Sequence, residues 1–343
     1  MTPLDSILLF GAVAIPAWLA GFPLRGWLAR RGILDLPKAY SSHDRPVPRG
    51  GGLLVVVAFF GWFFFGSHED LPAIGWVGLG TLAVAAISFR DDIQHQSRRL
   101  RFAIYTVAAA IFVFALRHHP AFGAWGPFWL FAPWLWLWVA GYANALNFID
   151  GIDGLAGSQA VGALLFGAVI CLFAEPTGAA GELAALQLVL AGAMAGFLGH
   201  NLPRARLFLG DVGSIATGFL LAAVAVLAAL TLGWQVGLAM AALHLGPVLD
   251  TGITLLRRMI QGQPVYERHR EFFFHRAIRS GRSHLSVTLT EAAIQAGGGG
   301  LLLVACQQPV PTFFLAIGGL AAVWLIFFGW CEWRFRRSRV AGK

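Results

Sequence analysis

Eleven apolar runs occupy most of this sequence and constrain its fold more than any other feature. The runs lie at residues 6–24, 52–66, 72–89, 102–116, 128–146, 156–174, 181–199, 213–231, 234–256, 286–306 and 311–331. A helix that crosses a bilayer needs about 20 mostly apolar residues, so eleven such helices leave room only for short loops. Of the 343 residues, 57% are apolar or aromatic and 12% are charged, whereas soluble domains are about a quarter charged. We therefore predict an all-α polytopic membrane protein with about eleven transmembrane helices, folded as a single domain over residues 1–343.

The basic residues predict how these helices are oriented in the membrane. If the N-terminus lies outside, every Lys and Arg except Arg117 falls in a cytoplasmic loop or in the C-terminal tail. Cytoplasmic loops of membrane proteins carry such an excess of Lys and Arg. The distribution therefore predicts a periplasmic N-terminus and a cytoplasmic C-terminus. It also explains the net charge of +8 without a nucleic-acid partner, because basic loops favour an anionic membrane leaflet.

Acidic residues gather at the predicted cytoplasmic ends of the helices. Asp91 and Asp92 follow one apolar run, the segment 150–153 follows another, and Asp211 precedes a third. Ionised carboxylates at such positions are costly without a partner, and adjacent carboxylates repel one another. Magnesium would relieve both costs, since it binds carboxylate oxygens together with substrate phosphates. The alternative is that each acid pairs with a neighbouring Arg, as Arg90 could pair with Asp91; three separate acidic sites at one face favour the metal.

The segment 144–156, NALNFIDGIDGLA, is the densest cluster of polar residues in the chain. Asn144, Asn147, Asp150 and Asp153 recur at three-residue spacing, which places them on adjoining positions at a helix end. The segment has no Lys or Arg, so membrane topology does not explain it. Amide and carboxylate groups without fixed cations suit recognition of a nucleobase or sugar, or binding of a metal.

Two shorter motifs could contact a nucleotide. Phe208 precedes the Gly210–Asp211 turn, where an aromatic ring either stacks on a base or packs in the interior; taken alone, packing is favoured. The segment 43–52 contains His43, Arg49 and three consecutive glycines. Its backbone donors and cations could bind phosphate, although three glycines equally suit the turn at a helix start.

The longest predicted cytoplasmic loop, residues 257–285, interleaves cations and histidines with aromatic residues. It includes Tyr266, His269, Arg270 and His275. Such a surface could bind phosphate, and a histidine could donate a proton or carry positive charge near neutral pH. The alternative is an amphipathic segment that lies on the bilayer surface; the two interpretations are compatible.

Taken together, these segments resemble the polyprenyl-phosphate N-acetylhexosamine-1-phosphate transferases of glycosyltransferase family 4. The matching stretches are SSHDRPVPRGGG at 41–52, FRDDIQHQSRRLR at 89–101, NALNFIDGIDGLA at 144–156, NLPRARLFLGDVGS at 201–214 and PVLDTGITLLRRMIQGQPVYERHR at 247–270. They occur in the family's order, on the predicted cytoplasmic side, so the resemblance covers nearly the whole chain. The pair of motifs around 144–156 and 208–214 is the most specific part.

The resemblance implies roles for individual residues. It makes Asp91 and Asp92 the acidic pair that activates the lipid phosphate beside the metal, and it assigns Asp150 and Asp211 to the metal and pyrophosphate site, with Asp211 the best metal ligand. It implies that Phe208 stacks on uracil. The residues that it implies for catalysis or substrate binding at other positions are His43, Arg49, Asn144, Asn147, Asp153, Asn201, His269 and Arg270.

The histidine loop departs from part of the family. The lipid I translocases carry a compact HxHH-like cluster there, whereas this chain has His269-Arg270 and then His275. The motif VYERHR at 265–270 is more similar to the motif of the O-antigen-initiating branch. That branch is often linked to 6-deoxy N-acetylhexosamines. Where some members have a lysine before the glycine turn, Arg45 or Arg49 is the available substitute.

The resemblance implies an enzyme of the bacterial inner membrane with its active site on the cytoplasmic face. It would transfer N-acetylhexosamine-1-phosphate from a UDP-sugar to undecaprenyl phosphate, with Mg²⁺, or Mn²⁺ in its place, as the cofactor. The motifs do not select among GlcNAc, GalNAc, FucNAc and QuiNAc. A homodimer is one option for the assembly. The alternatives are the lipid I-forming translocase and, in a different class, a polytopic transporter, whose charged groups would lie nearer the membrane midplane.

Overall fold

The computed structural model describes residues 1–343 except 38–44, 67, 72, 175–177, 265–268 and 342–343. The described chain is almost entirely helical. Its elements, in order, are α1 (Pro3–Arg30), β1 (Leu34–Asp35), β2 (Val47–Pro48), α2 (Leu53–Phe65), α3 (Ile74–Ile93), α4 (Arg98–Ala115), α5 (Ala121–Trp125), α6 (Phe128–Ile149), α7 (Leu155–Ala174), α8 (Gly178–Asn201), α9 (Gly210–Leu232), α10 (Trp234–Ala242), α11 (Leu245–Ile260), α12 (Phe273–Arg279), α13 (His284–Ala305) and α14 (Val310–Ala341). The two strands pair antiparallel over two residues each.

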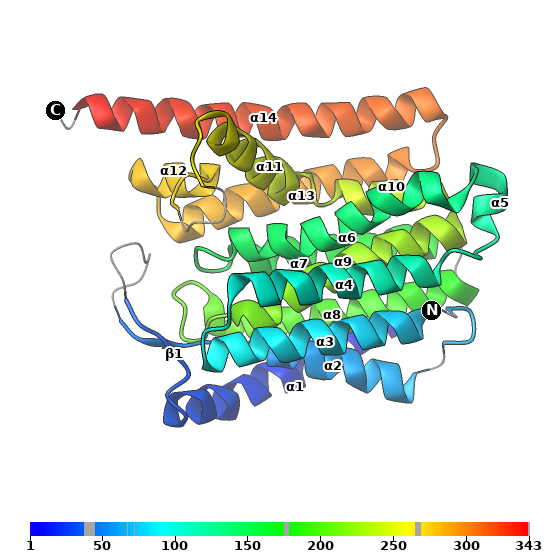
Figure 1. Ribbon diagram of the computed structural model, residues 1–343, viewed down its shortest axis with the longest axis horizontal. Helices are drawn as coiled ribbons and strands as arrows, with labels where there is room; N and C mark the ends of the chain where they lie inside the picture. The colour runs from blue at the N-terminus through cyan, green and yellow to red at the C-terminus, as the bar shows by residue number, and fades with distance from the viewer. Residues whose placement is uncertain (38–44, 67, 72, 175–177, 265–268, 342–343) are drawn as a thin grey trace.

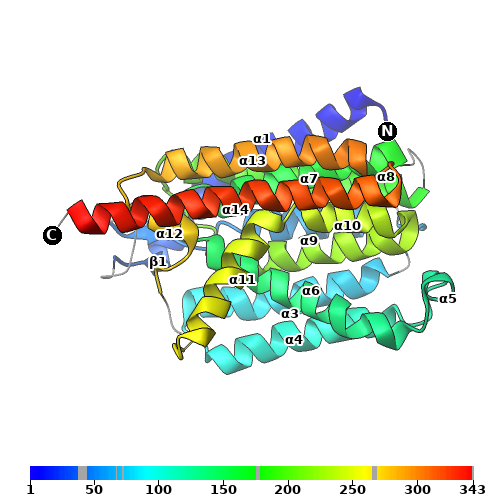
Figure 2. The ribbon, with the colours of Figure 1, turned by 90° about the horizontal axis from the view of Figure 1, so that it is seen from above.

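The long helices run side by side as one bundle (Figure 1). Helix α9 lies at its centre, where it packs against α3, α6 and α10, and every residue from Val212 to Ala228 is buried. This helix consists mostly of Ala, Leu, Val and Gly, and small residues let neighbouring helices approach closely. Helices α1 and α14 lie at opposite edges of the bundle, and a second view shows α14 extending beyond its neighbours toward the C-terminus (Figure 2).

The structure confirms a helical polytopic membrane protein, while the predicted number of spans stays a prediction. A helix overlaps each of the eleven predicted apolar runs. Within the described residues, seven helices are long and apolar enough to cross a membrane, or eight if α10 and α11 form one broken span. Helix α2, with 13 residues, is only about 20 Å long, shorter than the ~30 Å hydrocarbon core. Helix α4 begins with three arginines in its first four residues.

The predicted run 234–256 is not one straight helix. It divides into α10 and α11, whose axes differ by 66°. Gly246 and Pro247 lie in the first turn of α11, and a proline inside a continuous helix would remove a backbone hydrogen bond and clash with the preceding turn. The helix therefore ends before the proline and restarts, so that α11 points away from the bundle axis.

Candidate active site

Three carboxylates that are distant in sequence meet at one end of the bundle, which we call the acidic end. Asp91 and Asp92 lie in the last turn of α3, and Asp211 lies in the first turn of α9. The side chains of Asp91 and Asp92 are 4% and 0% exposed, while that of Asp211 is 21% exposed. The sequence predicted that these acids share one face, and the packing of α3 against α9 brings them into one network.

Asp92 caps the start of α9. Its Oδ1 accepts a hydrogen bond from the Asp211 amide at 3.1 Å, and its Oδ2 accepts one from the Val212 amide at 3.0 Å. The first N–H groups of a helix have no partner within the helix, and a negative charge there is favourable. Gly210 has φ +77°, and a Cβ at this position would lie 2.7 Å from Asp92 Oδ2. Glycine is therefore required where the two elements meet.

Two arginines neutralise this cluster. Arg49 Nε donates to Asp92 Oδ1 at 2.9 Å, and the Arg49 guanidinium lies 4.0 Å from Asp91. Arg101, from the first turn of α4, donates to Asp91 Oδ2 at 2.7 Å and also to Asp211 Oδ2. The pairing of acids with arginines, the alternative to a metal, is therefore present, with Arg49 and Arg101 as the partners rather than Arg90. No motif in the sequence distinguishes Arg101 from the other arginines of its loop.

Helix α6 brings the segment 144–153 to the same end. Asn147 Nδ2 donates to Asp211 Oδ1 at 3.2 Å and to Ser214 Oγ at 2.8 Å. Asp150 follows the last residue of α6 and is half-buried. Burial raises the pKa of Asp150 well above its usual value, and the Asp211 and Asp92 carboxylates raise it further. Among the residues that the structure describes, none donates a hydrogen bond to the Asp150 carboxylate.

Asp153 and Asn201 hold two loops together beside this network. Asn201 Oδ1 accepts from the Gly154 amide at 2.6 Å, and its Nδ2 donates to the Leu207 carbonyl at 3.0 Å. Asp153 Oδ2 accepts from the Ala205 amide at 3.2 Å and lies 3.5 Å from His284 Nδ1. The contacts fix the turn after α6 against the segment that leads to Asp211. His284 lies at the start of α13 without a recognisable motif, which explains why the sequence did not identify it.

The segment 45–52 joins the same assembly through its backbone. The Phe208 amide donates to the Pro48 carbonyl at 2.8 Å, and the Gly50 and Gly51 amides donate to the Phe208 carbonyl. The Gly52 amide donates to Leu209, and α2 begins at the next residue. These glycines therefore form the helix-start turn, and their N–H groups are already engaged rather than free for phosphate. The Phe208 side chain is half-buried.

Two other predicted residues contribute less to this network. Asn144 Nδ2 donates to the Ala140 carbonyl of its own helix at 2.8 Å. His43 lies outside the described residues.

The histidine loop packs against the end of α6. The His269 ring lies 4.7 Å from that of Phe272, which in turn lies 5.8 Å from Phe148. Asp250 of α11 accepts from the Phe273 amide at 2.8 Å and so anchors the loop. Burial lowers the pKa of His269, helped by the charge of Arg258; the ring is therefore neutral near pH 7.

His275 and Arg270 belong to the same loop. Burial, with Arg270 nearby, lowers the pKa of His275 to about 3, so this ring is neutral as well. A Cβ added at Gly151 would lie 3.2 Å from His275 Nε2, which places His275 beside the turn that carries Asp150. Arg270 is half-buried, and its carbonyl accepts from Arg279.

The donor chemistry at the acidic end fits a magnesium ion through Asp150. Within the described residues no three His, Cys, Asp or Glu side chains converge as a ready metal site, because Asp91, Asp92 and Asp211 face guanidinium groups. When ionised, these three acids and Asp150 exceed the charge of Arg49 and Arg101 by two, which one divalent cation would balance. Magnesium commonly uses one or two carboxylates plus substrate phosphates. Asp150, whose carboxylate oxygens accept no hydrogen bond from the described residues, would supply one carboxylate ligand, and Asp211 would supply the second.

The fold and this site define a class: a polytopic helical membrane protein with a network of acids and arginines at one end of its bundle. Residues 74–229 match the model of glycosyl transferase family 4. Decaprenyl-phosphate N-acetylglucosaminephosphotransferase of Mycobacterium tuberculosis is 30% identical over 325 residues, which cover 84% of this chain and 79% of the relative. The chain belongs to this family, as a polyprenyl-phosphate sugar-1-phosphate transferase.

Two further relatives show the breadth of the family. A Bacillus subtilis protein named "Probable undecaprenyl-phosphate N-acetylglucosaminyl 1-phosphate transferase" is 27% identical over 262 residues, 74% of this chain and 72% of the relative. Phospho-N-acetylmuramoyl-pentapeptide-transferase of Thermosynechococcus vestitus is 36% identical over 200 residues, which cover 52% of this chain and 49% of the relative. Family membership favours a transferase over the transporter alternative.

Proposed function

We propose that this protein transfers N-acetylhexosamine-1-phosphate from a UDP-sugar to undecaprenyl phosphate, giving undecaprenyl-diphospho-sugar and UMP. The reaction would initiate the synthesis of O-antigen or another surface polysaccharide at the cytoplasmic face of the inner membrane. One observation carries the proposal: in a chain of this family, Asp91, Asp92 and Asp211 form a single network with Arg49 and Arg101, beside the uncommitted Asp150.

The chemistry requires such a network because both substrates are anionic. An oxygen of the lipid phosphate attacks the sugar-bearing phosphorus of the UDP-sugar, and the bond from this phosphorus to the UMP oxygen breaks. Magnesium, when bound, neutralises phosphate charge and orients the reacting groups. Arg49 and Arg101 hold positive charge beside the incoming phosphates, while the backbone hydrogen bonds that Asp92 accepts keep the start of α9 in place. Asn147 fixes the Asp211 side chain.

The donor would lie against the loops that surround this network. Phe208, half-buried beside Arg49 and Asp211, offers a ring on which uracil could stack, worth about 1–3 kcal/mol. The neutral His269 and the cationic Arg270 would meet the diphosphate; a guanidinium can contact phosphate oxygens through two N–H groups. The acceptor's tail stays in the bilayer, which explains why the reacting groups lie at helix ends rather than in a separate soluble domain.

The test is to incubate the purified protein with undecaprenyl phosphate, magnesium and a panel of UDP-sugars, and to identify the lipid product by mass spectrometry. The panel includes UDP-GlcNAc, UDP-GalNAc, UDP-FucNAc, UDP-QuiNAc and UDP-MurNAc-pentapeptide. We expect a diphospho-lipid product from one of the N-acetylhexosamines and none from the pentapeptide donor. A product from the pentapeptide donor alone would instead identify the lipid I translocase.

The same assay tests the cofactor and the acidic end. Asp211→Asn should lower turnover by at least about 100-fold, whereas Arg337→Gln, in the exposed end of α14, should leave it unchanged. Chelation of magnesium should abolish turnover of the unaltered protein, and Mn²⁺ should restore it. Full turnover in excess chelator, or an Asp211→Asn variant as active as Arg337→Gln, would contradict the proposed site.

A further inference from the structure

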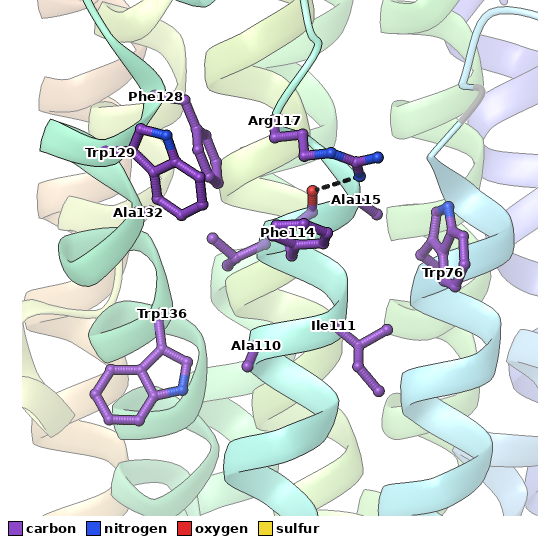
Figure 3. A pocket seen from close by; sticks show the side chains of 11 residues that line it. Trp76, Ala110, Ile111, Phe114, Ala115, Arg117, Phe128, Trp129, Ala132 and Trp136 are labelled. Atoms are coloured by element: carbon purple, nitrogen blue, oxygen red, sulfur yellow. Dashed lines mark hydrogen bonds between the residues drawn. The ribbon is translucent and has the colours of Figure 1, made fainter.

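A second site of distinct character lies at the opposite end of the bundle from the acidic network. Here the C-terminal half of α4 forms a groove with α3 and α6, with a volume of about 630 Å³ (Figure 3). Its walls are almost wholly apolar, and they include Ile111 and Phe114 of α4, Trp76 of α3 and Trp129 of α6. The volume lies in the range of about 300–1,000 Å³ that is typical of small-molecule sites.

Arg117 lies at the rim of this groove. Its guanidinium lies 4.4 Å above the Phe114 ring and donates to the Phe114 carbonyl at 3.2 Å (Figure 3). The side chain is exposed, and no carboxylate pairs with it in the part of the chain that the structure describes. Arg117 is also the one Lys or Arg that the charge distribution places on the outer side. A cation thus lies at a position where the positive-inside rule disfavours one.

The groove is held in shape by contacts between helices and continues along α4. Trp136 Nε1 donates to the Thr106 carbonyl at 3.2 Å, which joins α6 to α4 at the inner end of the groove. Ile111 also lines a second cavity, of about 230 Å³, which follows α3 and α4 as far as Ala103. The distance along α4 from its last residue, Ala115, to Ala103 is about 18 Å, more than half of the ~30 Å hydrocarbon core.

We propose that this groove binds one anionic phospholipid, whose phosphate pairs with Arg117 and whose acyl chain lies along α4. A lipid tail gains little from an apolar wall over other lipid tails, so selectivity must come from the headgroup. Arg117 supplies it, because a guanidinium forms charge-assisted hydrogen bonds with phosphate. Trp76 and Trp129 flank the rim as interfacial tryptophans do.

The position of the charge distinguishes this occupant from the tail of the acceptor. The acceptor's phosphate must reach the acidic end, so its polyprenyl tail would bring only hydrocarbon to Arg117. A phospholipid of the outer leaflet has the opposite polarity: its phosphate lies at Arg117 and its tail points toward the membrane centre. The phosphate of such a lipid would meet the cation at the rim of the groove, and its tail would meet the apolar walls.

The test uses photoreactive lipids in phosphatidylcholine vesicles that contain the full-length protein. Phosphatidylglycerol and diacylglycerol, each with the photoreactive group on an acyl chain, are crosslinked separately, and the labelled peptides are identified by mass spectrometry. We expect phosphatidylglycerol to label residues 110–117 and 128–136 more than diacylglycerol does. Arg117→Gln should lower that labelling about fivefold, as expected for the loss of one cation near an anionic lipid, and should leave diacylglycerol labelling unchanged.

Arg31→Gln is the matched control, since Arg31 is also exposed and its guanidinium lies 5.8 Å from the Trp27 ring. This variant should label like the unaltered protein. Equal labelling by the two lipids, or no effect of Arg117→Gln, would overturn the proposal. So would crosslinking of these segments to a second copy of the chain, because the groove would then be covered by protein.

Discussion

Asp150 differs from the other carboxylates of the acidic end because no described residue donates a hydrogen bond to it. Asp91, Asp92 and Asp211 each accept from Arg49, Arg101 or a backbone amide. Burial and the neighbouring carboxylates raise the pKa of Asp150. A carboxyl group whose pKa is raised on folding stabilises the folded protein while it is protonated. That stabilisation is lost as the pH rises through the folded-state pKa.

Asp150→Asn should therefore stabilise the protein at high pH. In excess chelator, we expect the variant to melt a few degrees above the unaltered protein at pH 8, with little difference at pH 5. Glu69→Gln, which removes an exposed carboxylate, should change neither melting temperature. Differential scanning fluorimetry at both pH values measures the effect. A destabilisation of equal size at pH 5 and pH 8 would show that Asp150 has a structural role instead.

The residues of the candidate site could be predicted better than the side chains and loops with which they form hydrogen bonds and ion pairs. Asp91, Asp92, Asn147 and Asp211 were identified from motifs, and the structure joins them in one network through Arg49, Arg101 and the start of α9. Arg101 was not identified, because its contact with Asp211 crosses 110 positions of the sequence and depends on how α4 packs against α3. A local pattern carries no such information. For the same reason the links from Asp153 and Asn201 to other loops emerged only from the structure.

At the level of elements, the contact between α3 and the start of α9 is the main support of the acidic end. Asp92 is fully buried and links two backbone amides of α9 to Arg49. Removal of this side chain would uncap the helix and leave a largely buried arginine without its closest partner. Loss of one partner from a buried ion pair costs about 3–5 kcal/mol, whereas loss of a cap alone costs about 1 kcal/mol.

We expect the order of thermal stability to be unaltered protein, then Asp92→Asn, then Asp92→Ala, with a loss of about 3 kcal/mol for the last. Asn retains an oxygen for one amide but loses the charge that pairs with Arg49. Asp5→Ala is the control, because Asp5 caps the exposed start of α1 through Thr2 and forms no ion pair with an arginine among the described residues. If Asp92→Ala were no less stable than Asp5→Ala, the contact between α3 and α9 would not be the support that the geometry indicates.

The positions of the helices could be predicted closely, but the bend between α10 and α11 could not. Each apolar run became a helix because a buried backbone in a membrane must satisfy its own hydrogen bonds. The break between α10 and α11 was missed because Gly246 and Pro247 lie inside a run that is mostly apolar and was taken as one helix. The run 52–66 matches α2 to within one residue at each end, although a helix of 13 residues is shorter than the hydrocarbon core.

At the level of the whole molecule, the two termini lie at opposite ends of the bundle (Figure 1), as the predicted odd number of membrane crossings would require. The orientation rests on charge: Arg334, Arg336 and Arg337 lie in the part of α14 nearest the C-terminus, whereas Arg117 lies at the other end. Helix α14 has 32 residues and is about 48 Å long, so its basic end extends past the hydrocarbon core.

This orientation can be tested with two introduced cysteines, one at each end of the bundle. His118 and Ser338 are both exposed, and the native Cys171, Cys306 and Cys331 are buried, so they should contribute little labelling. In intact cells whose outer membrane admits a membrane-impermeant maleimide, His118→Cys should be labelled at once, whereas Ser338→Cys should be labelled only after the inner membrane is permeabilised. The unaltered protein serves as the blank.

Because the acidic end and residue 338 lie on the same side of the bundle, labelling of Ser338→Cys from outside would move the site to the periplasmic face. A cytoplasmic UDP-sugar could not reach it there, and the proposed donor would then be wrong.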